Sequence, residues 1–288
     1  MNLESTSPNI NKTEKVRNKI KAELKGFGVP EIPEIVDHLV VLEENSRFND
    51  DSRMILEGIG NVLDLIDSFK LTTIQRKRLF LATYLGDIGK TSSSKDTECQ
   101  LAVARLFSKE NLDSNQKVTR VLQLYFPAEE VDPVILNLFK VGIGPDTLMP
   151  EFWRKHAFWT QEILDRHQDV FDKSTRTIAA SHHINSGIDP YKIRVEGKVK
   201  GTWEWEVSNE EKFSILLFMA MDKYQAFIVR SKKSHKEAIK LLKDELKPFD
   251  GDDLKDMIVR AIEQLGGTDS VFPEGLKDLK AKKDGIIK

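Results

Sequence analysis

The chain has little that would stabilise or anchor it apart from a hydrophobic core. Its 288 residues include one cysteine, Cys99, which excludes a disulfide framework and a thiolate zinc site. It has no run of about 18 apolar residues, so no membrane span is expected. Its N-terminus lacks the apolar segment of a signal peptide. These absences predict a protein of a reducing, cytoplasmic compartment that does not bind membranes.

The charge balance argues against a polyanionic partner. The sequence holds 44 Lys and Arg against 46 Asp and Glu, for a formal net charge of -2. Nonspecific affinity for nucleic acid requires an excess of positive charge. Direct nucleic-acid binding is therefore not expected, whereas the oligomeric state stays open and includes a homo-oligomer.

Apolar residues recur mainly at helical spacing, which predicts an all-α fold. Glycines and prolines separate the expected helices, which cover residues 13–25, 32–47, 52–69, 72–85, 101–107, 116–125, 134–141, 150–168, 174–185, 209–230, 234–246 and 254–265. Residues 191–207 alternate in polarity and have glycines at the bends, which predicts one small β-hairpin.

The same pattern predicts four parts along the chain. A flexible tail is expected over residues 1–12 and a helical extension over 13–51. The main helical domain is predicted over 52–270, with an insertion at about 91–145. A Lys-rich tail follows over 271–288.

Five residues appear in an order that is typical of metal ligands. Asp87, His156, the adjacent pair His182 and His183, and Asp222 each lie on or next to an apolar helical run. The chain has only six histidines, and burying imidazoles without partners is unfavourable. Imidazole and carboxylate together suit iron, manganese or zinc, so the sequence predicts one or two divalent ions.

A metal site of this kind has a defined chemistry. A divalent ion activates water at neutral pH and polarises a phosphoryl group. Lys90 follows Asp87 by three residues and carries a charge that would neutralise a phosphate. Asp222 is the candidate residue that orients the site or accepts a proton. Asp87, Lys90 and Asp222 are therefore the candidate catalytic residues.

These motifs resemble those of one protein family. Residues 85–90, Leu-Gly-Asp-Ile-Gly-Lys, are similar to the His-Asp-Ile-Gly-Lys motif of the HD superfamily of metal-dependent phosphohydrolases. The segment His156–Leu164 resembles the next histidine motif of the HD-GYP branch. His182 and His183 resemble its double histidine, and residues 220–226 resemble its closing aspartate helix.

The resemblance spans roughly residues 52–245 and implies an HD-domain-like helical bundle that binds divalent metal. The HD-GYP branch hydrolyses cyclic di-GMP, so it implies a nucleotide-like or cyclic dinucleotide ligand. By this comparison Asp87 and the histidines at 156, 182 and 183 match one metal site. Asp222 matches the last ligand of a neighbouring site.

The sequence departs from the family pattern in two of its ligands. Gly86 stands where the family has the histidine of the His-Asp pair. The segment 52–61, where the opening histidine is expected, has none, and Glu57 or Asn61 are its candidate replacements. The Gly-Tyr-Pro segment of the branch is rearranged over residues 184–191. One metal site is therefore predicted to be incomplete, with hydrolytic activity that is weak, narrowed or lost.

Each candidate residue also has an ordinary structural interpretation. His156 can be a satisfied histidine on an amphipathic helix, and Asp87 can be a polar helix terminus. Asp222 can pair with an Arg or Lys, and Lys90 can be a solvated lysine. The remaining histidines are expected at the surface: His38, His167 and His235.

The sequence leads to competing hypotheses of function. The first is a metal-dependent phosphohydrolase or phosphodiesterase that acts on a nucleotide-like phosphoester. The second is a catalytically inactive HD-type domain that serves in signalling or protein interaction. A third is a helical scaffold whose histidines do not converge.

Overall fold

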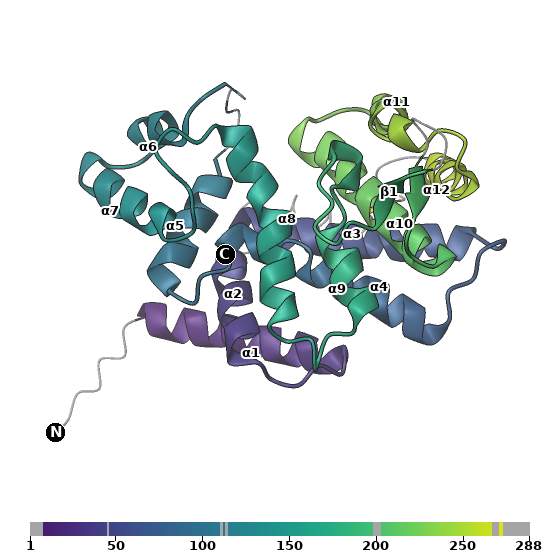
Figure 1. Ribbon diagram of the computed structural model, residues 1–288. Coiled ribbons are helices and arrows are strands. Elements are labelled where there is room, and N and C mark those ends of the chain that lie inside the picture. Colours follow the sequence, from purple (N-terminus) through teal and green to yellow (C-terminus); the bar gives the residue numbers. More distant parts are fainter. Residues whose placement is uncertain are drawn as a thin grey trace. The chain divides into compact units, whose positions relative to one another are not determined.

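The computed structural model describes residues 8–44, 46–109, 112, 115–197, 203–266 and 271–272. Within these residues the protein is helical apart from one small hairpin (Figure 1). The chain divides into two compact units, each made of two separate stretches of sequence. Unit 1 comprises residues 1–49 and 88–171, and unit 2 comprises residues 50–87 and 172–288. The predicted all-α class is confirmed.

Unit 1 is built from α-helices and one short 3-10 helix. Its elements are α1 (Pro8–Gly26), α2 (Pro33–Glu44), η1 (Ile88–Thr91), α5 (Thr97–Phe107), α6 (Val118–Tyr125), α7 (Ala128–Phe139) and α8 (Met149–Asp165). α1 packs against α2, and α5 packs against both α2 and α7. η1 packs against α8, α5 and α2, which places this short helix at the centre of unit 1.

Unit 2 contains the remaining elements. They are α3 (Ser46–Leu65, from Asp50 on), α4 (Thr73–Leu85), α9 (Lys173–Ala180), η2 (Ile184–Ser186), β1 (Arg194–Glu196), β2 (Trp203–Trp205), α10 (Asn209–Gln225), the π-helix η3 (Ala226–Arg230), α11 (His235–Glu245), η4 (Lys247–Phe249) and α12 (Asp253–Gln264). α4 packs against α9, and α10 contacts both of them (Figure 1).

α10 forms the core of unit 2. Its residues from Phe213 to Met221 are all buried, and the helix contacts α4, α9, α11 and α12. A helix that is apolar on all sides is stable only when other elements surround it. Asp222 follows this run directly and is 8% exposed, so a carboxylate lies beside an apolar core.

Side-chain caps define where several helices begin. Thr72 accepts a hydrogen bond from the backbone N–H of Gln75 and starts α4, as its sequence predicts. Ser208 and Ser234 form the same kind of capping box at the starts of α10 and α11. α1 begins at Pro8, inside the predicted tail, and the rest of that tail, residues 1–7, lies outside the described residues.

The predicted hairpin is confirmed. β1 and β2 pair antiparallel, with Val195 opposite Glu204. The Trp205 ring packs against Phe249 with centroids 5.8 Å apart. Of the predicted Lys-rich tail, only residues 271–272 lie within the described part of the chain. Among the described helices, none has the length and apolar character needed to cross a membrane.

Candidate metal centre

The double histidine lies in a turn that follows α9. The helix begins at the N-cap Asp172, whose carboxylate accepts the backbone N–H of Thr175 at 2.8 Å. It ends at Ala180, so the predicted helix over residues 174–185 is wrong in its second half. The short helix η2 follows and closes at Gly187, whose φ of 74° stops further helix. His182 and His183 therefore sit on the connection between two helices.

The orientation of His182 makes Nε2 the atom with which its ring could bind a metal ion. Its Nδ1 lies 2.7 Å from the carbonyl oxygen of Ala179. A carbonyl only accepts, so Nδ1 carries the proton and the neutral ring keeps its lone pair on Nε2. Metal-binding histidines are commonly held in this way by a carbonyl behind the ring. The same bond satisfies one of the last carbonyls of α9.

Asp87 faces the Nε2 atom of His182. It follows α4 and is 8% exposed, whereas His182 is 1% exposed. The distance from His182 Nε2 to Asp87 Oδ1 is 3.8 Å. Two ligand atoms that each lie about 2.1 Å from one ion are at most about 4.2 Å apart. The pair therefore fits a divalent ion such as iron, manganese or zinc.

Phe218 on α10 supports this arrangement from one side. The His182 ring stacks on Phe218 with centroids 4.6 Å apart and an interplanar angle of 20°. A Cβ atom at Gly86 would lie 2.5 Å from Cζ of the same phenylalanine. Position 86, where the HD motif has a histidine, thus faces an aromatic ring. No side chain fits there unless Phe218 moves.

A second group of charges lies around Arg230 in unit 2. Its guanidinium donates to Asp51 Oδ2 at 2.8 Å, and the amide of Gln225 donates to Asp51 Oδ1 at 2.6 Å. Burial lowers the pKa of Arg230, but the carboxylates of Asp51, Asp222 and Asp87 raise it by more. Asp222 therefore has the cationic neighbour that its ordinary structural interpretation requires.

Sequence reasoning missed Arg230, Asp51, Gln225 and Phe218. One signal for Arg230 was present, because a carboxylate in an apolar helix needs a cation. Arg230 follows Asp222 by eight residues on a nearly continuous helix. Asp51 comes from α3, and no local pattern links it to either residue.

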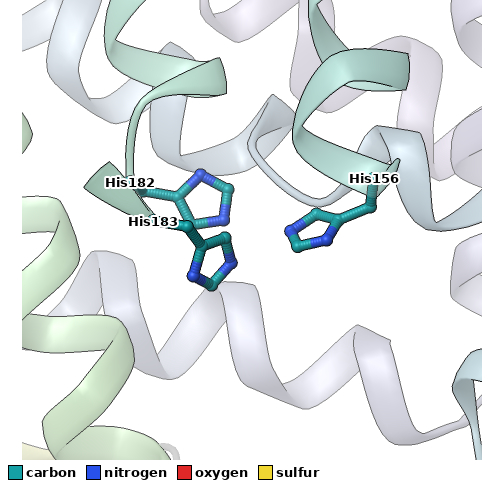
Figure 2. Close-up of side chains that lie close together, drawn as sticks. All are labelled: His156, His182 and His183. Atoms are coloured by element: carbon teal, nitrogen blue, oxygen red, sulfur yellow. The ribbon is translucent and has the colours of Figure 1, made fainter. Parts of the chain in front are cut away.

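Figure 2 labels three histidines, His156 on α8 and the adjacent His182 and His183 on the turn after α9. His156 belongs to unit 1, and the other two belong to unit 2. His183 is half-buried, and its ring centroid lies 4.1 Å from that of His182. The imidazole of His183 is a donor for the same metals as the pair of His182 and Asp87 in unit 2.

In unit 1, His156 has the same tautomer as His182, because a backbone carbonyl three residues earlier accepts the hydrogen bond of its Nδ1 atom. Its Nδ1 lies 2.6 Å from the carbonyl oxygen of Trp153, so Nδ1 is again the donor and Nε2 keeps the lone pair. The ring is 5% exposed and makes an edge contact with Phe107, at a centroid distance of 5.8 Å. Its setting on α8 is thus that of an oriented, buried imidazole.

η1 carries Lys90 and lies directly on α8. The N–H of Gly89 donates to Thr160 Oγ1 at 3.1 Å, and a Cβ atom at Gly89 would collide with the carbonyl oxygen of His156. Glycine allows this close approach. Lys90 is 8% exposed, so the interpretation as a solvated lysine is wrong.

His38 is buried and not at the surface, which corrects its sequence-based placement. It is 0% exposed, and its Nδ1 lies 2.6 Å from Thr91 Oγ1. The hydroxyl of Thr91 donates to the carbonyl of Ile88, so it accepts from His38. Burial lowers the pKa of His38 to about 4, which keeps the ring neutral.

The candidate replacement ligands lie on α3 in unit 2. The amide nitrogen of Asn61 donates a hydrogen bond to the carbonyl oxygen of Val271 at 3.0 Å, so this group already has a partner within the protein. Glu57 is half-buried on the same helix. Neither is established as a ligand, and both stay predictions.

One cavity in unit 2 is separate from these residues. It has a volume of about 680 Å³ and lies between the hairpin and the starts of α10 and α12, with Arg194, Trp205 and Lys212 in its lining. Asn209, at the start of α10, also lines it. At 1.5 Å per residue, Asn209 is about 20 Å along the helix from Asp222. The donor chemistry, and not the cavity, therefore identifies the candidate site.

Comparison with protein-family models, with curated proteins and with solved structures found no match for the chain. The resemblance to the HD superfamily consequently rests on the sequence motifs alone.

Proposed function

We propose that this chain is an HD-type, metal-dependent phosphohydrolase that acts on a nucleotide-like phosphoester. The observation that carries the proposal is the pairing of His182 Nε2 with Asp87 Oδ1 across 3.8 Å. The Ala179 carbonyl holds the imidazole in the ligating tautomer, and both side chains are buried. A buried carboxylate that faces an imidazole lone pair is a donor set for a divalent cation.

In this proposal each residue has one role. Asp87, His182 and His183 hold the ion, and His156 is a further ligand predicted from the sequence. A bound divalent ion would supply Lewis-acid activation of water and of a phosphoryl group. Asp222 accepts a proton near the end of α10. Lys90 contributes a positive charge for the phosphate. The nucleotide-like substrate follows from the family resemblance.

We expect the activity to be slow. A pair of metal ions stabilises both the entering and the leaving oxygen of a phosphoester. Gly86 supplies no side-chain ligand, and Phe218 occupies the space beside it. The donors that support the proposal therefore serve one ion and not a symmetric pair.

Metal content tests the proposal directly. The wild-type chain, purified anaerobically from metal-supplemented medium, is expected to carry about one equivalent of iron, manganese or zinc by elemental analysis. The variant His182→Ala/His183→Ala should lose it. His167→Ala, which alters a histidine outside the proposed ligands, is the matched control and should retain it. Full metal content in the double variant would refute the proposed ligands.

Turnover is then measured with bis(4-nitrophenyl) phosphate and with cyclic di-GMP. Metal-dependent release of product that is lost in Asp87→Asn supports hydrolysis. Full activity in that variant, or in metal-free protein, would refute the assigned chemistry.

One observation favours a second function, that of a non-catalytic binding module. Phe218 packs against Gly86 and His182, which makes this part of the site rigid and apolar. A chain that binds cyclic di-GMP in calorimetry without turning it over would have this function. Turnover of either substrate would exclude it.

A further inference from the structure

Three buried carboxylates of unit 2 come from three different helical segments. Asp51 lies on α3, Asp87 follows α4, and Asp222 lies on α10. They are 4%, 8% and 8% exposed. Buried carboxylates are unfavourable unless a cation or hydrogen-bond donors compensate them. The cations around these residues therefore determine what else the site can bind.

Arg230 is a cation that acts on all three. Its Nη2 atom lies 2.8 Å from Asp51 Oδ2. Asp51, Asp222 and Asp87 are also the carboxylates that interact most strongly with its charge. A guanidinium keeps its charge at every physiological pH. Its attraction to the carboxylates therefore does not depend on its own protonation at physiological pH.

The backbone places Arg230 for this contact. α10 ends at Gln225, and the π-helix η3 follows over Ala226–Arg230. A short π-helix adds a residue to a helical turn and so changes the face on which the following side chains lie. Such segments are frequent at functional sites. Gln225, the last residue of α10, and Arg230, the last residue of η3, bind the two oxygens of Asp51. Gln225 is 0% exposed, so the bond on its side is inside the core.

Asp87 interacts with two groups of different chemistry. Nε2 of His182 is a neutral donor that suits a metal ion, and it lies 3.8 Å from Asp87 Oδ1. The guanidinium of Arg230, which is bonded to Asp51, carries a fixed positive charge that also acts on Asp87 and Asp222. A second divalent ion at these carboxylates would meet a fixed positive charge. It would also lack a side-chain ligand at Gly86, where Phe218 fills the space.

We infer that Arg230 is a built-in counter-ion that takes the place of a second divalent cation, so that the site binds a single metal ion. The inference rests on the proposed metal-binding function of His182 and Asp87. It goes further, because it assigns the number of ions and the residue that determines it.

The experiment replaces Arg230 and counts metal ions. The full chain and the variant Arg230→Gln are titrated with Mn²⁺ alone by calorimetry, and the bound metal is then measured by elemental analysis. The wild type should bind one ion and Arg230→Gln two. Arg230→Lys keeps the charge and should bind one. Arg260→Gln removes an exposed arginine of α12 and should also bind one.

Each outcome decides between the two proposals. One ion at unchanged affinity in Arg230→Gln, or two ions in the wild type, would overturn the inference and leave the metal function standing. No ion in the wild type but binding in Arg230→Gln would support the counter-ion role and refute the metal function of the native chain. No ion in either protein would refute both.

Loss of folding in the variant is also informative. If Arg230→Gln is unfolded without metal, the circular dichroism spectrum is measured again with Mn²⁺ added. Recovery of helix in the presence of Mn²⁺ supports the inference, because a cation then replaces the guanidinium. A variant that stays unfolded at saturating Mn²⁺ would contradict it.

Discussion

Phe218 links the features of the candidate centre at the scale of single residues. It stacks on His182 and fills the space at Gly86, so the ring orients one candidate ligand and leaves no space for a side chain at position 86. His182 is fixed twice, by this ring and by the Ala179 carbonyl. A ligand that is already oriented loses little conformational freedom when it binds an ion. Small changes at Gly86 should therefore affect both stability and the site.

Replacing Gly86 with Ala should destabilise the protein by about 1–3 kcal/mol, because the new Cβ atom would overlap the ring of Phe218, which also stacks on His182. Urea unfolding followed by circular dichroism measures the change. Gly60→Ala is the matched control, since nothing lies within 4 Å of a Cβ atom there. It should stabilise the protein by up to about 1 kcal/mol.

A second variant checks the cause of this effect. Phe218→Leu removes the ring atoms that a Cβ atom at Gly86 would meet. The loss caused by Gly86→Ala should therefore be smaller in the Phe218→Leu background. Equal losses in both backgrounds would contradict the assigned contact.

At the scale of elements, two short segments position the candidate ligands. α9 ends next to His182, and its start is capped by Asp172. η1 begins one residue after Asp87 and packs on α8, the helix of His156. Short helices of this kind have little stability of their own and depend on caps and packing. Their ends should therefore be sensitive to single substitutions.

Asp172→Ala should lower the free energy of unfolding by about 1 kcal/mol, because the backbone N–H of Thr175 loses its acceptor. It should also weaken Mn²⁺ binding, since α9 carries the turn with His182. Asp172→Ser keeps a capping oxygen and should restore most of both losses. The ion pair with Arg78 is exposed and should contribute little. Wild-type stability in Asp172→Ala would rule out the capping role.

Gly89→Ala should be more damaging, with a loss of about 3 kcal/mol or more. The added Cβ atom would collide with the backbone carbonyl of His156, which cannot rotate away as a side chain can. Gly26→Ala, at the end of α1 in the same unit, meets nothing within 4 Å and serves as the control. Both are compared by thermal unfolding. Similar melting temperatures for the two variants would disprove the close approach of η1 to α8.

At the scale of the whole molecule, the chain passes between its two compact units after residues 49, 87 and 171. The passage after residue 87 separates Asp87 from η1, so one sequence motif contributes to both units. Each unit has its own buried polar groups. In unit 1 the neutral imidazole of His38 lies between Thr91 and Gln100, with its Nε2 atom 3.5 Å from the Gln100 amide.

Because of the buried imidazole of His38, we expect the free energy of unfolding to depend on pH. Burial lowers the pKa of His38 to about 4 from 6.5, so its contribution is complete above pH 6.5 and is lost as the pH falls toward 4. The loss should reach about 3 kcal/mol. Urea midpoints of the wild type and of His38→Gln, measured from pH 7 to pH 4, test it. The two curves should converge at low pH, and parallel curves would refute the prediction.

Much of the fold follows from local patterns. The start of α4 at Thr72, the apolar run of α10 and the alternating hairpin strands depend on residues close in sequence. Apolar spacing and caps indicate these elements without knowledge of tertiary contacts. The end of α9 was misplaced because it depends on a side chain that bonds backward to Ala179. His38 was misplaced because its burial depends on η1 and α5.

The candidate ligands Asp87, His182 and Asp222 could be named from the sequence because their residue types and order are unusual. That these residues bind a metal ion remains a proposal. Arg230, Asp51 and Phe218 could not be named, because their roles depend on contacts between segments far apart in the chain.

The sequence by itself therefore determined the helical class, the hairpin and the chemical types of the candidate ligands, since local spacing and side-chain chemistry are properties of the chain. Only the tertiary structure decided the approach of His182 to Asp87, the aromatic ring at Gly86 and the guanidinium beside the buried carboxylates. These features depend on distances between atoms of different helices, and packing determines such distances when the whole core forms.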